Sequence, residues 1–388
     1  MTSPAAIIGG VAYVSGGLAA VGCLYVLAAS LFALRFRRLE QGGKGSETWP
    51  AVTVMVPLCG DEPGLSERLR RLRRQAYPGP VEVVCGVRDA TDPAVAAARS
   101  VAAEEAGWPL DLHIDPRLYG RNLKISNLIN TLEHARHDVL VMVDSDMELP
   151  PDYLARIIDE LEKPGVGAVT CLYHGVARGG LAARLSAMGI NLHFLPNAVF
   201  GLRMRMTHPC FGATIALSRD QLERIGGLRA FADQLWDDYA IGRAVRTTGK
   251  QVAVGAAVPA HICTETSLRR LFAGQLRAAR TIRGIDPAGH VGAVITHPLP
   301  FALFALCLTG AWWAAALTGA ALACRIVLGT CVSRRFGAPR PPLALVPLRD
   351  LLSFAIYVAS FFGATVEWRG QRYRVGDNGT LISTANRG

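Results

Sequence analysis

The stretch Val139-Leu140-Val141-Met142-Val143-Asp144-Ser145-Asp146 decides the fold of this 388-residue chain. Its short apolar run is rich in valine, which is typical of a buried strand in a parallel sheet. Two carboxylates follow at once, and ligands of open α/β sheets bind beyond the carboxyl ends of strands. Mg²⁺ or Mn²⁺ is commonly held by one or two carboxylates together with a substrate diphosphate. The stretch therefore predicts a metal site for a nucleotide-sugar at Asp144 and Asp146, and a solvated Asp-Ser-Asp turn is the alternative.

Strands and helices alternate on the N-terminal side of this stretch. The β-α-β-α-β order predicts a doubly wound α/β sheet with right-handed crossovers. The C-terminal side is less regular. On the N-terminal side we predict strands over 52–56, 81–87 and 110–114, and helices over 65–75, 93–106 and 122–134. On the C-terminal side we predict strands within 165–173 and over 211–217 and 252–258, and helices over 219–225, 235–247 and 268–283.

The N-terminus carries a long apolar segment. Residues 5–34 contain no charged side chain, and about 20 apolar residues are enough to cross a bilayer. A signal peptide would begin with positive charge and have a shorter apolar core, so this segment predicts a permanent anchor. Basic residues follow it, which places its C-terminal end in the cytoplasm. They are Arg35, Arg37, Arg38 and Lys44.

Three further apolar stretches leave alternatives open. Residues 299–329 predict one long tilted helix or a hairpin turning near Thr318-Gly319. Residues 343–366 are interrupted by Arg349 and Asp350, so we expect a re-entrant or interfacial segment. Residues 181–206 are too interrupted for a span, and an interfacial segment and a buried helix pair both fit. The expected organisation is an anchor over 1–38, a cytoplasmic catalytic domain over 39–292, and a membrane region of two or three segments with a basic cytoplasmic tail over 293–388.

Charge and cysteine usage narrow the class of protein. The chain carries 41 Lys and Arg against 31 Asp and Glu, a net charge of +10. No basic stretch is interleaved with aromatic residues, so we expect no nucleic-acid partner. Arginines beside apolar segments suit an anionic membrane surface instead. The nine cysteines form no C-x-x-C pair, so neither a zinc site nor a disulfide framework is predicted.

Further acidic and basic side chains fall at predicted strand ends and helix starts. In Trp236-Asp237-Asp238-Tyr239, capping of a helix N-terminus is the alternative to a role in chemistry. A sugar transferase needs one carboxylate to accept the proton of the attacking hydroxyl, and cations to stabilise the departing diphosphate. The candidate acids besides Asp144, Asp146 and Asp238 are Asp61, Glu62 and Asp92, and the candidate cations are Lys124, Arg277 and Arg280.

Five motifs occur in order: Val56-Pro57-Leu-Cys-Gly-Asp-Glu-Pro-Gly-Leu65, Asp89-Ala-Thr-Asp92-Pro-Ala94, Lys124-Ile-Ser-Asn-Leu128, Asp144-Ser-Asp146 and Asp237-Asp238-Tyr239. Together they resemble those of the ceramide-glucosyltransferase-like enzymes, glycosyltransferase family 21, which have a GT-A fold. The resemblance covers about residues 51–300 and extends to the flanking apolar segments. Gly167-Ala-Val-Thr-Cys-Leu-Tyr173, Pro209-Cys-Phe-Gly212 and Ala232-Asp-Gln-Leu-Trp-Asp-Asp-Tyr-Ala-Ile241 are similar to the hopanoid-biosynthesis branch of that family.

The resemblance implies an inverting, UDP-sugar-dependent glycosyltransferase of a bacterial inner membrane, with N-acetylglucosamine as the sugar and bacteriohopanetetrol as the lipid acceptor. It also implies roles for individual residues. Asp238 would be the catalytic base. The donor would be bound by Asp61, Asp89, Asp92, Lys124, Asp144 and Arg277, and Mg²⁺ or Mn²⁺ would be held by Asp144 and Asp146.

One motif departs from the family pattern. The family carries Gln/Arg/His-x-x-Arg-Trp after the base, whereas this chain has Gly274-Gln-Leu-Arg277-Ala278. The alternative register ending at Arg280-Thr281 also lacks the Trp. Two other functions therefore stay open: transfer of glucose from UDP-glucose to ceramide or another sphingolipid, and a catalytically silent membrane relative.

Overall fold

The computed structural model describes residues 4–36, 49–208, 210–363, 365–368, 371–375 and 380–383. Some residues used above lie outside these ranges, namely the basic residues Arg37, Arg38 and Lys44, the linker up to Thr48, Pro209 of one family-like stretch, and part of the basic tail.

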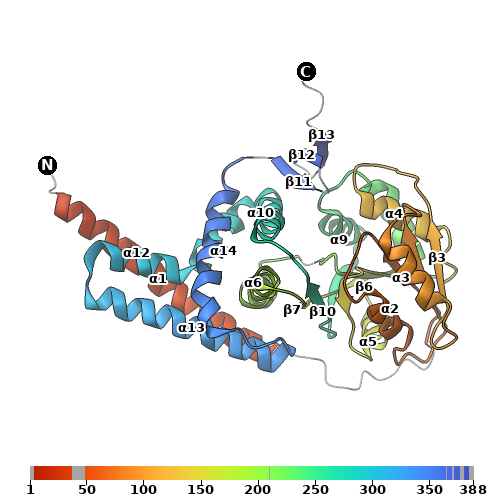
Figure 1. Cartoon of the computed structure of the whole chain (residues 1–388), viewed down its shortest axis with the longest axis horizontal. Coiled ribbons are helices and arrows are strands. Elements are labelled where there is room, and N and C mark those ends of the chain that lie inside the picture. The colour runs from red at the N-terminus through yellow and green to blue at the C-terminus, as the bar shows by residue number, and fades with distance from the viewer. Residues whose placement is uncertain are drawn as a thin grey trace.

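A seven-stranded mixed sheet forms the centre of the α/β domain (Figure 1), with the strand order β3-β2-β1-β4-β8-β6-β9. The four strands β3, β2, β1 and β4 are parallel, and β8 runs antiparallel to both β4 and β6. The predicted alternation is therefore confirmed, and the antiparallel β8 makes the sheet mixed. The strands are β1 (Val52–Pro57), β2 (Val81–Val87), β3 (Leu110–Ile114), β4 (Val139–Val143), β6 (Val166–Cys171), β8 (Thr214–Ser218) and β9 (Gln251–Gly255).

Helices cover both faces of this sheet. Because side chains alternate along a strand, β4 supplies Val139, Val141 and Val143 to one core and Leu140 and Met142 to the other. The first core includes helices α2 (Leu65–Arg73), α3 (Pro93–Ala102) and α5 (Tyr153–Leu161). The second includes α4 (Leu123–Leu132), α8 (Arg219–Arg224), η2 (Leu228–Phe231) and α9 (Asp237–Thr247). The result is a three-layer domain with the Asp144 strand at its centre.

A small second sheet, of order β5-β10-β7, lies beyond the end of β4. Its strands, β5 (Met147–Glu148), β7 (His174–Ala177) and β10 (Ala260–Cys263), are too short to show a periodic pattern in the sequence. The Ile262 amide donates to the Asp146 carbonyl at 2.9 Å. This sheet therefore brings residues near 261 to the Asp-Ser-Asp turn.

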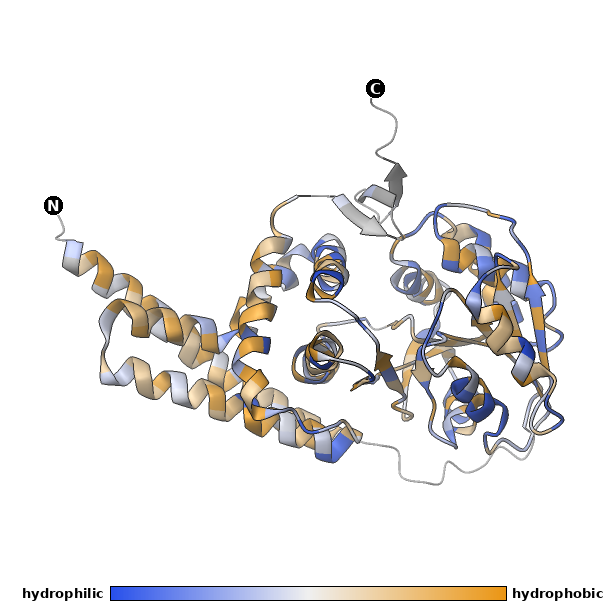
Figure 2. Cartoon of the chain, viewed as in Figure 1, coloured by the Kyte–Doolittle hydropathy of each residue, from blue (hydrophilic) through white to orange (hydrophobic). Residues whose placement is uncertain are grey.

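Helices α1 (Pro4–Arg35), α12 (Pro298–Thr309) and α13 (Trp312–Phe336) pack against one another and extend away from the α/β domain (Figure 1). Figure 2 shows apolar residues along all three. The chain turns between α12 and α13 at Gly310, where φ is 59°. Both alternatives for residues 299–329 are therefore wrong, because α12 and α13 are separate helices and Thr318 and Gly319 lie inside α13. Gly310 adopts the left-handed conformation that ends a helix without the strain a Cβ would bring.

Four described segments are long and apolar enough to cross a membrane. They are Ala6–Arg35, Leu181–Arg203, Trp312–Phe336 and Leu343–Ser360, and the bent pair Pro287–Thr296 and Pro298–Thr309 would make a fifth. The second of them, Leu181–Arg203, contradicts the expectation that residues 181–206 are too interrupted for a span. It is not one regular helix, because a π-helix (Ile190–Phe194) separates α6 (Leu181–Gly189) from α7 (Leu195–Arg203). These helices indicate that the protein associates with a membrane.

Helix α14 (Val346–Ser360) follows η4 (Leu343–Leu345) and runs across the α1–α12–α13 bundle, beside α6 and α10 (Figure 1). Its buried side chains include Arg349 and Asp350, whereas Leu348 and Leu351 are 45% and 42% exposed. Charged groups therefore face inward and apolar groups outward, an arrangement that both the interfacial and the re-entrant prediction allow. After α10 (Leu268–Ile285), α11 (Pro287–Gly292) and η3 (Ala293–Thr296) lead into α12, and β11 (Thr365–Trp368), β12 (Gln371–Val375) and β13 (Leu381–Ser383) form a third sheet after α14.

Candidate active site

Lys124 lies in the first turn of α4, which begins because the Asn122 side chain caps it by accepting the Ile125 amide at 3.0 Å. Its Nζ atom is 2.5 Å from Oδ1 of Asp144 and donates to the Gly212 carbonyl at 3.0 Å. Burial alone would lower the pKa of Lys124, but the carboxylates of Asp144, Asp237 and Asp238 outweigh it and raise the pKa. The side chain is therefore a fixed positive charge at the end of β4.

Asp238 lies in the first turn of α9. Its Oδ2 accepts the Gly212 amide at 2.9 Å, and its Oδ1 accepts the Tyr239 amide at 2.8 Å. The second bond is local to the first turn of α9, whereas the first reaches a glycine 26 residues away, and α9 has no side-chain cap. Since the Gly212 carbonyl also accepts Lys124, one glycine joins the candidate base to the Lys124–Asp144 pair. Burial raises the pKa of Asp238.

Asp237 is the second carboxyl of this cluster. Its Oδ1 accepts the Asn122 side-chain amide at 3.2 Å, and the same amide donates to the Gln234 carbonyl at 2.8 Å. Burial raises the pKa of Asp237 to about 6, with Lys124 opposing the shift and Asp238 adding to it. The cap of α4 therefore also fixes the turn that precedes α9.

Asp146 faces a histidine that the sequence did not single out. Its Oδ2 atom is 3.7 Å from Nδ1 of His261, a buried atom that has no hydrogen-bond partner among the described residues. Desolvation by the surrounding protein raises the pKa of Asp146 to about 6, although 40% of its side chain is exposed to solvent. No ready-made group of three or more His, Cys, Asp or Glu ligands occurs in the described ranges. Two protein ligands completed by substrate oxygens fit Mg²⁺ or Mn²⁺, and the unpartnered His261 nitrogen fits such a site.

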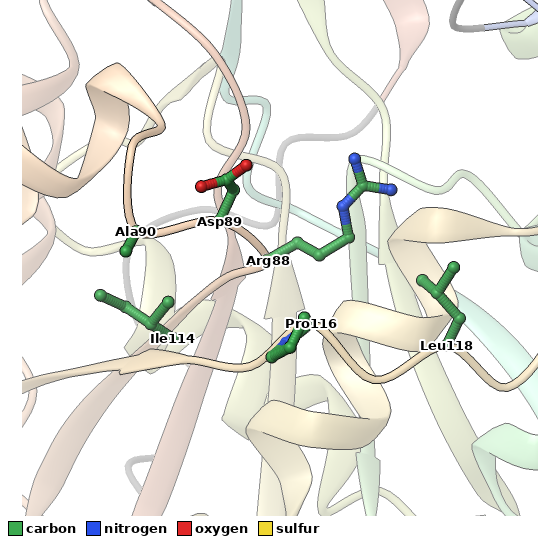
Figure 3. A pocket seen from close by; sticks show the side chains of 6 residues that line it. All are labelled: Arg88, Asp89, Ala90, Ile114, Pro116 and Leu118. Carbon is green, nitrogen blue, oxygen red and sulfur yellow. The ribbon is translucent and has the colours of Figure 1, made fainter.

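A pocket of about 580 Å³ opens at the ends of β2 and β3. Figure 3 shows Asp89 beside Arg88 on one of its walls, with Ile114 and Pro116 on the next segment. Its apolar and charged groups lie on neighbouring strand ends, which is where α/β folds bind nucleosides.

Asp61 and Asp92, which the resemblance places at the donor together with Asp89, do not line this pocket. Asp61 is exposed at the tip of the β1–α2 loop. Asp92 caps α3 by accepting the Ala94 amide, and both of its oxygens accept the Gly60 amide, at 2.8 and 2.9 Å. The carboxylate of Asp92 therefore holds the loop that carries Asp61.

The structure distinguishes the two registers of the degraded motif on α10. Arg280 donates to the carbonyls of Phe362 and Thr365, so it caps the chain after α14. Arg277 is half-buried on the same helix. Contact of Arg277 with the donor stays a prediction.

An aromatic side chain lies among the candidate carboxylates. Tyr173 stacks on Phe194 of the π-helix at 4.7 Å and meets His261 edge-on at 5.7 Å. Burial raises the pKa of Tyr173, and Asp238, Asp146 and Asp144 raise it further. The Tyr173 ring therefore interacts electrostatically with both the candidate base and the candidate metal ligands. No spacing rule connects Tyr173 or His261 to the Asp-Ser-Asp turn, so sequence reasoning missed both.

The sequence of this chain matches the profile of Glycosyl transferase family 21 over residues 17–381. It is 21% identical over 243 residues to ceramide glucosyltransferase 1 of Caenorhabditis elegans, an alignment covering 61% of this chain and 52% of that protein. It is 32% identical over 130 residues to the ceramide glucosyltransferase of Pyricularia oryzae, covering 30% of this chain and 26% of that protein. The matches thus span about half or less of these relatives.

Among solved structures, the chain is similar to a mannosyltransferase from Pyrobaculum calidifontis in complex with GDP-mannose and Mn²⁺. The TM-score is 0.49 and the identity 24%, with 89% of this chain and 99% of the other covered. The α/β domain described above, with its seven-stranded mixed sheet, agrees with the predicted α/β fold class. The family profile covers nearly the whole chain and confirms the predicted enzyme class, and the chain belongs to glycosyl transferase family 21.

Proposed function

We propose that this protein is an inverting glycosyltransferase that moves a sugar from a UDP-sugar to the hydroxyl of a membrane lipid. The observation that carries the proposal is the role of Gly212. Its carbonyl accepts Lys124 and its amide donates to Asp238, so a cation suited to a diphosphate and a carboxylate suited to a hydroxyl meet at one residue. Both groups are needed at the same carbon atom in a direct displacement.

In the proposed reaction, Asp238 accepts the proton of the lipid hydroxyl as its oxygen bonds to the anomeric carbon. The bond from that carbon to the diphosphate breaks on the opposite face, so an α-linked donor gives a β-glycoside. Lys124 and Arg277 would neutralise the leaving diphosphate. Asp144 and Asp146 would hold a divalent cation, with His261 beside Asp146, and the cation would supply further positive charge when bound. Asp61 and Asp89 would contact the nucleoside, and Asp92 would act there through the loop that it holds.

We propose N-acetylglucosamine as the sugar and bacteriohopanetetrol as the acceptor, on the basis of the hopanoid-branch stretches in the sequence. The acceptor would come from the bilayer, because the aromatic contact of Tyr173 with Phe194 connects the carboxylates to the apolar segment 181–203. In this proposal residues 1–38 anchor the chain in a bacterial inner membrane, residues 39–292 form the cytoplasmic catalytic domain, and residues 293–388 form the C-terminal membrane region.

A second candidate keeps the chemistry and changes the substrates to UDP-glucose and ceramide. The curated relatives named as ceramide glucosyltransferases favour it. A silent relative is the candidate of another class, and the observation that favours it is Ala278, which stands where the family has Trp.

The test is UDP release by the full-length protein in detergent, with each donor paired with each lipid. We expect release with UDP-N-acetylglucosamine and the hopanoid, and an Asp238→Asn variant should lose at least about 100-fold in kcat. Unchanged release by Asp238→Asn would refute the assignment of the base.

Lipid mass spectrometry of cells with and without the protein tests the acceptor independently. Loss of an aminosugar hopanoid supports the proposal, whereas loss of a glucosylated sphingolipid supports the second candidate. No UDP release from any pair, by folded protein, would favour the silent relative.

A further inference from the structure

A buried arginine on α2 reaches the residue between the two aspartates of the Asp-Ser-Asp turn. The Arg68 side chain is only 7% exposed. Its Nε donates to the Ser145 carbonyl at 2.7 Å, and its Nη1 donates to the Pro63 carbonyl at 2.8 Å. Burying a guanidinium costs free energy unless its N–H groups are hydrogen-bonded. Here both of these bonds are accepted by backbone carbonyls of loops.

Glu62 closes the same cluster. Its Oε2 accepts Nη2 of Arg68 at 3.0 Å, and its Oε1 accepts the Ser145 hydroxyl at 2.7 Å. Arg68, Glu62 and Ser145 thus form a closed ring of hydrogen bonds, which we term the Ser145 clamp. Bonds that involve ionised groups are stronger than neutral ones and fix orientation as well as distance.

The clamp holds Ser145 at two points, its carbonyl and its hydroxyl. A residue held in both main chain and side chain cannot rotate freely, so the backbone from which Asp144 and Asp146 project is held as well. On the other side, Asp92 holds Gly60. The loop segment between these two anchors carries Asp61. One rigid loop therefore connects the turn of the candidate metal site to the side of the domain where the nucleoside would bind.

We infer that Arg68 and Glu62 are positioning residues that orient Asp144 and Asp146 toward a divalent cation and the donor diphosphate. The inference rests on the proposed function, because it assigns these two aspartates to metal and donor. It predicts that loss of the clamp weakens binding of Mn²⁺ and UDP together rather than removing the proton-accepting step at Asp238.

The experiment compares Arg68→Lys, Glu62→Gln and Ser145→Ala in the full-length protein in detergent. Arg68→Lys keeps the charge but loses the planar fork that reaches three acceptors. We expect each variant to need at least about 10-fold more Mn²⁺ for half-saturation in the presence of UDP. Free Mn²⁺ is measured by electron paramagnetic resonance, so the readout does not depend on turnover. In kinetics, KM for the UDP-sugar should rise more than kcat falls.

A double variant and a control variant distinguish the effect of losing the clamp from general destabilisation of the protein. Glu62→Ala combined with Ser145→Ala should weaken Mn²⁺ binding no more than Glu62→Ala alone, because Glu62→Ala already removes the hydrogen bond that Ser145→Ala removes. Arg224→Lys alters an exposed ion pair with Asp220 on α8 and should bind Mn²⁺ and UDP like the wild type.

The outcomes separate the inference from the proposed function. If the wild type binds Mn²⁺ with UDP and all folded clamp variants bind equally well, the inference is overturned and the proposed function stands. If the wild type itself binds no Mn²⁺ with UDP, both are overturned. Ser145→Ala removes only one hydroxyl, so it decides the matter even if Arg68→Lys does not fold.

Discussion

The Nζ atom of Lys124 and the Oδ1 atom of Asp144 lie 2.5 Å apart, an ion pair that joins the first turn of α4 to the end of β4. Asp237 and Asp238 add negative charge around the same ammonium group. Lys124 is therefore the half-buried cation that lets several carboxylates approach one another at this end of the sheet.

Replacing Lys124 by Met removes this charge and keeps most of the side-chain volume. We expect kcat/KM for the UDP-sugar to fall by about 10²–10³-fold, because a preorganised cation at a developing negative charge is worth that much. UDP release measures it. Lys163→Met, which removes an ion pair with Glu160 on α5, is the matched control and should leave kcat/KM unchanged. A Lys124→Met enzyme with wild-type kcat/KM would contradict the assignment.

Asp237 predicts how stability depends on pH. Burial raises its pKa to about 6, above the value of about 3.9 for an unfolded chain. The folded protein therefore binds this proton more tightly than the unfolded protein, so stability from this group is present below about pH 4 and is lost as pH rises to about 6.

Asp237→Asn removes the ionisable carboxyl group, and with it the loss of stability that its ionisation causes as pH rises. The variant should have a higher Tm than the wild type at pH 7, and the difference should disappear near pH 4, as measured by thermal unfolding in detergent. Asp220→Asn, at an exposed position on α8, should show no such trend. A difference that is equal at both pH values would refute the assigned ionisation.

Two glycines of α10 predict opposite outcomes. A Cβ on Gly284 would lie 2.4 Å from the indole of Trp236, which directly precedes Asp237, whereas a Cβ on Gly274 would meet nothing within 4 Å. Gly284→Ala should therefore displace Trp236 and lower both Tm and kcat. Gly274→Ala should keep kcat and gain up to about 1 kcal/mol from helix propensity. Equal Tm and kcat for the two variants would show that the position of Trp236 does not depend on its close contact with Gly284.

The buried pair of Arg325 and Asp350 joins α13 to α14, with Nε 3.0 Å from Oδ2 and side chains 2% and 1% exposed. Asp350→Ala leaves a buried guanidinium without its counter-ion, and we expect a loss of about 3–5 kcal/mol in the free energy of unfolding. Asp220→Ala, at the exposed pair, should change it by less than about 0.5 kcal/mol. A loss for Asp350→Ala as small as that of the control would mean that water or another group compensates the charge.

Elements with a strong local pattern could be predicted from the sequence. The strands β1, β2, β3 and β4 agree with prediction to within one residue, because each is a short segment of mainly apolar or alternating apolar and polar residues bounded by polar or turn residues. The hairpin at Gly310 was placed nine residues too far along the chain, since both Gly310 and Gly319 lie in apolar sequence and only packing chooses between them. The short strands β5, β7 and β10 carry no period to detect.

The sequence by itself determined the alternating α/β order, the apolar helices and the acids that follow strand ends, because each depends on residues within one or two turns of each other. Tertiary structure alone decided which of these acids meet. Strand order brings His261 to Asp146, Gly212 to both Lys124 and Asp238, and Glu62 to Ser145. These partners lie far apart along the chain, and no local pattern encodes a contact that depends on how the whole sheet is assembled.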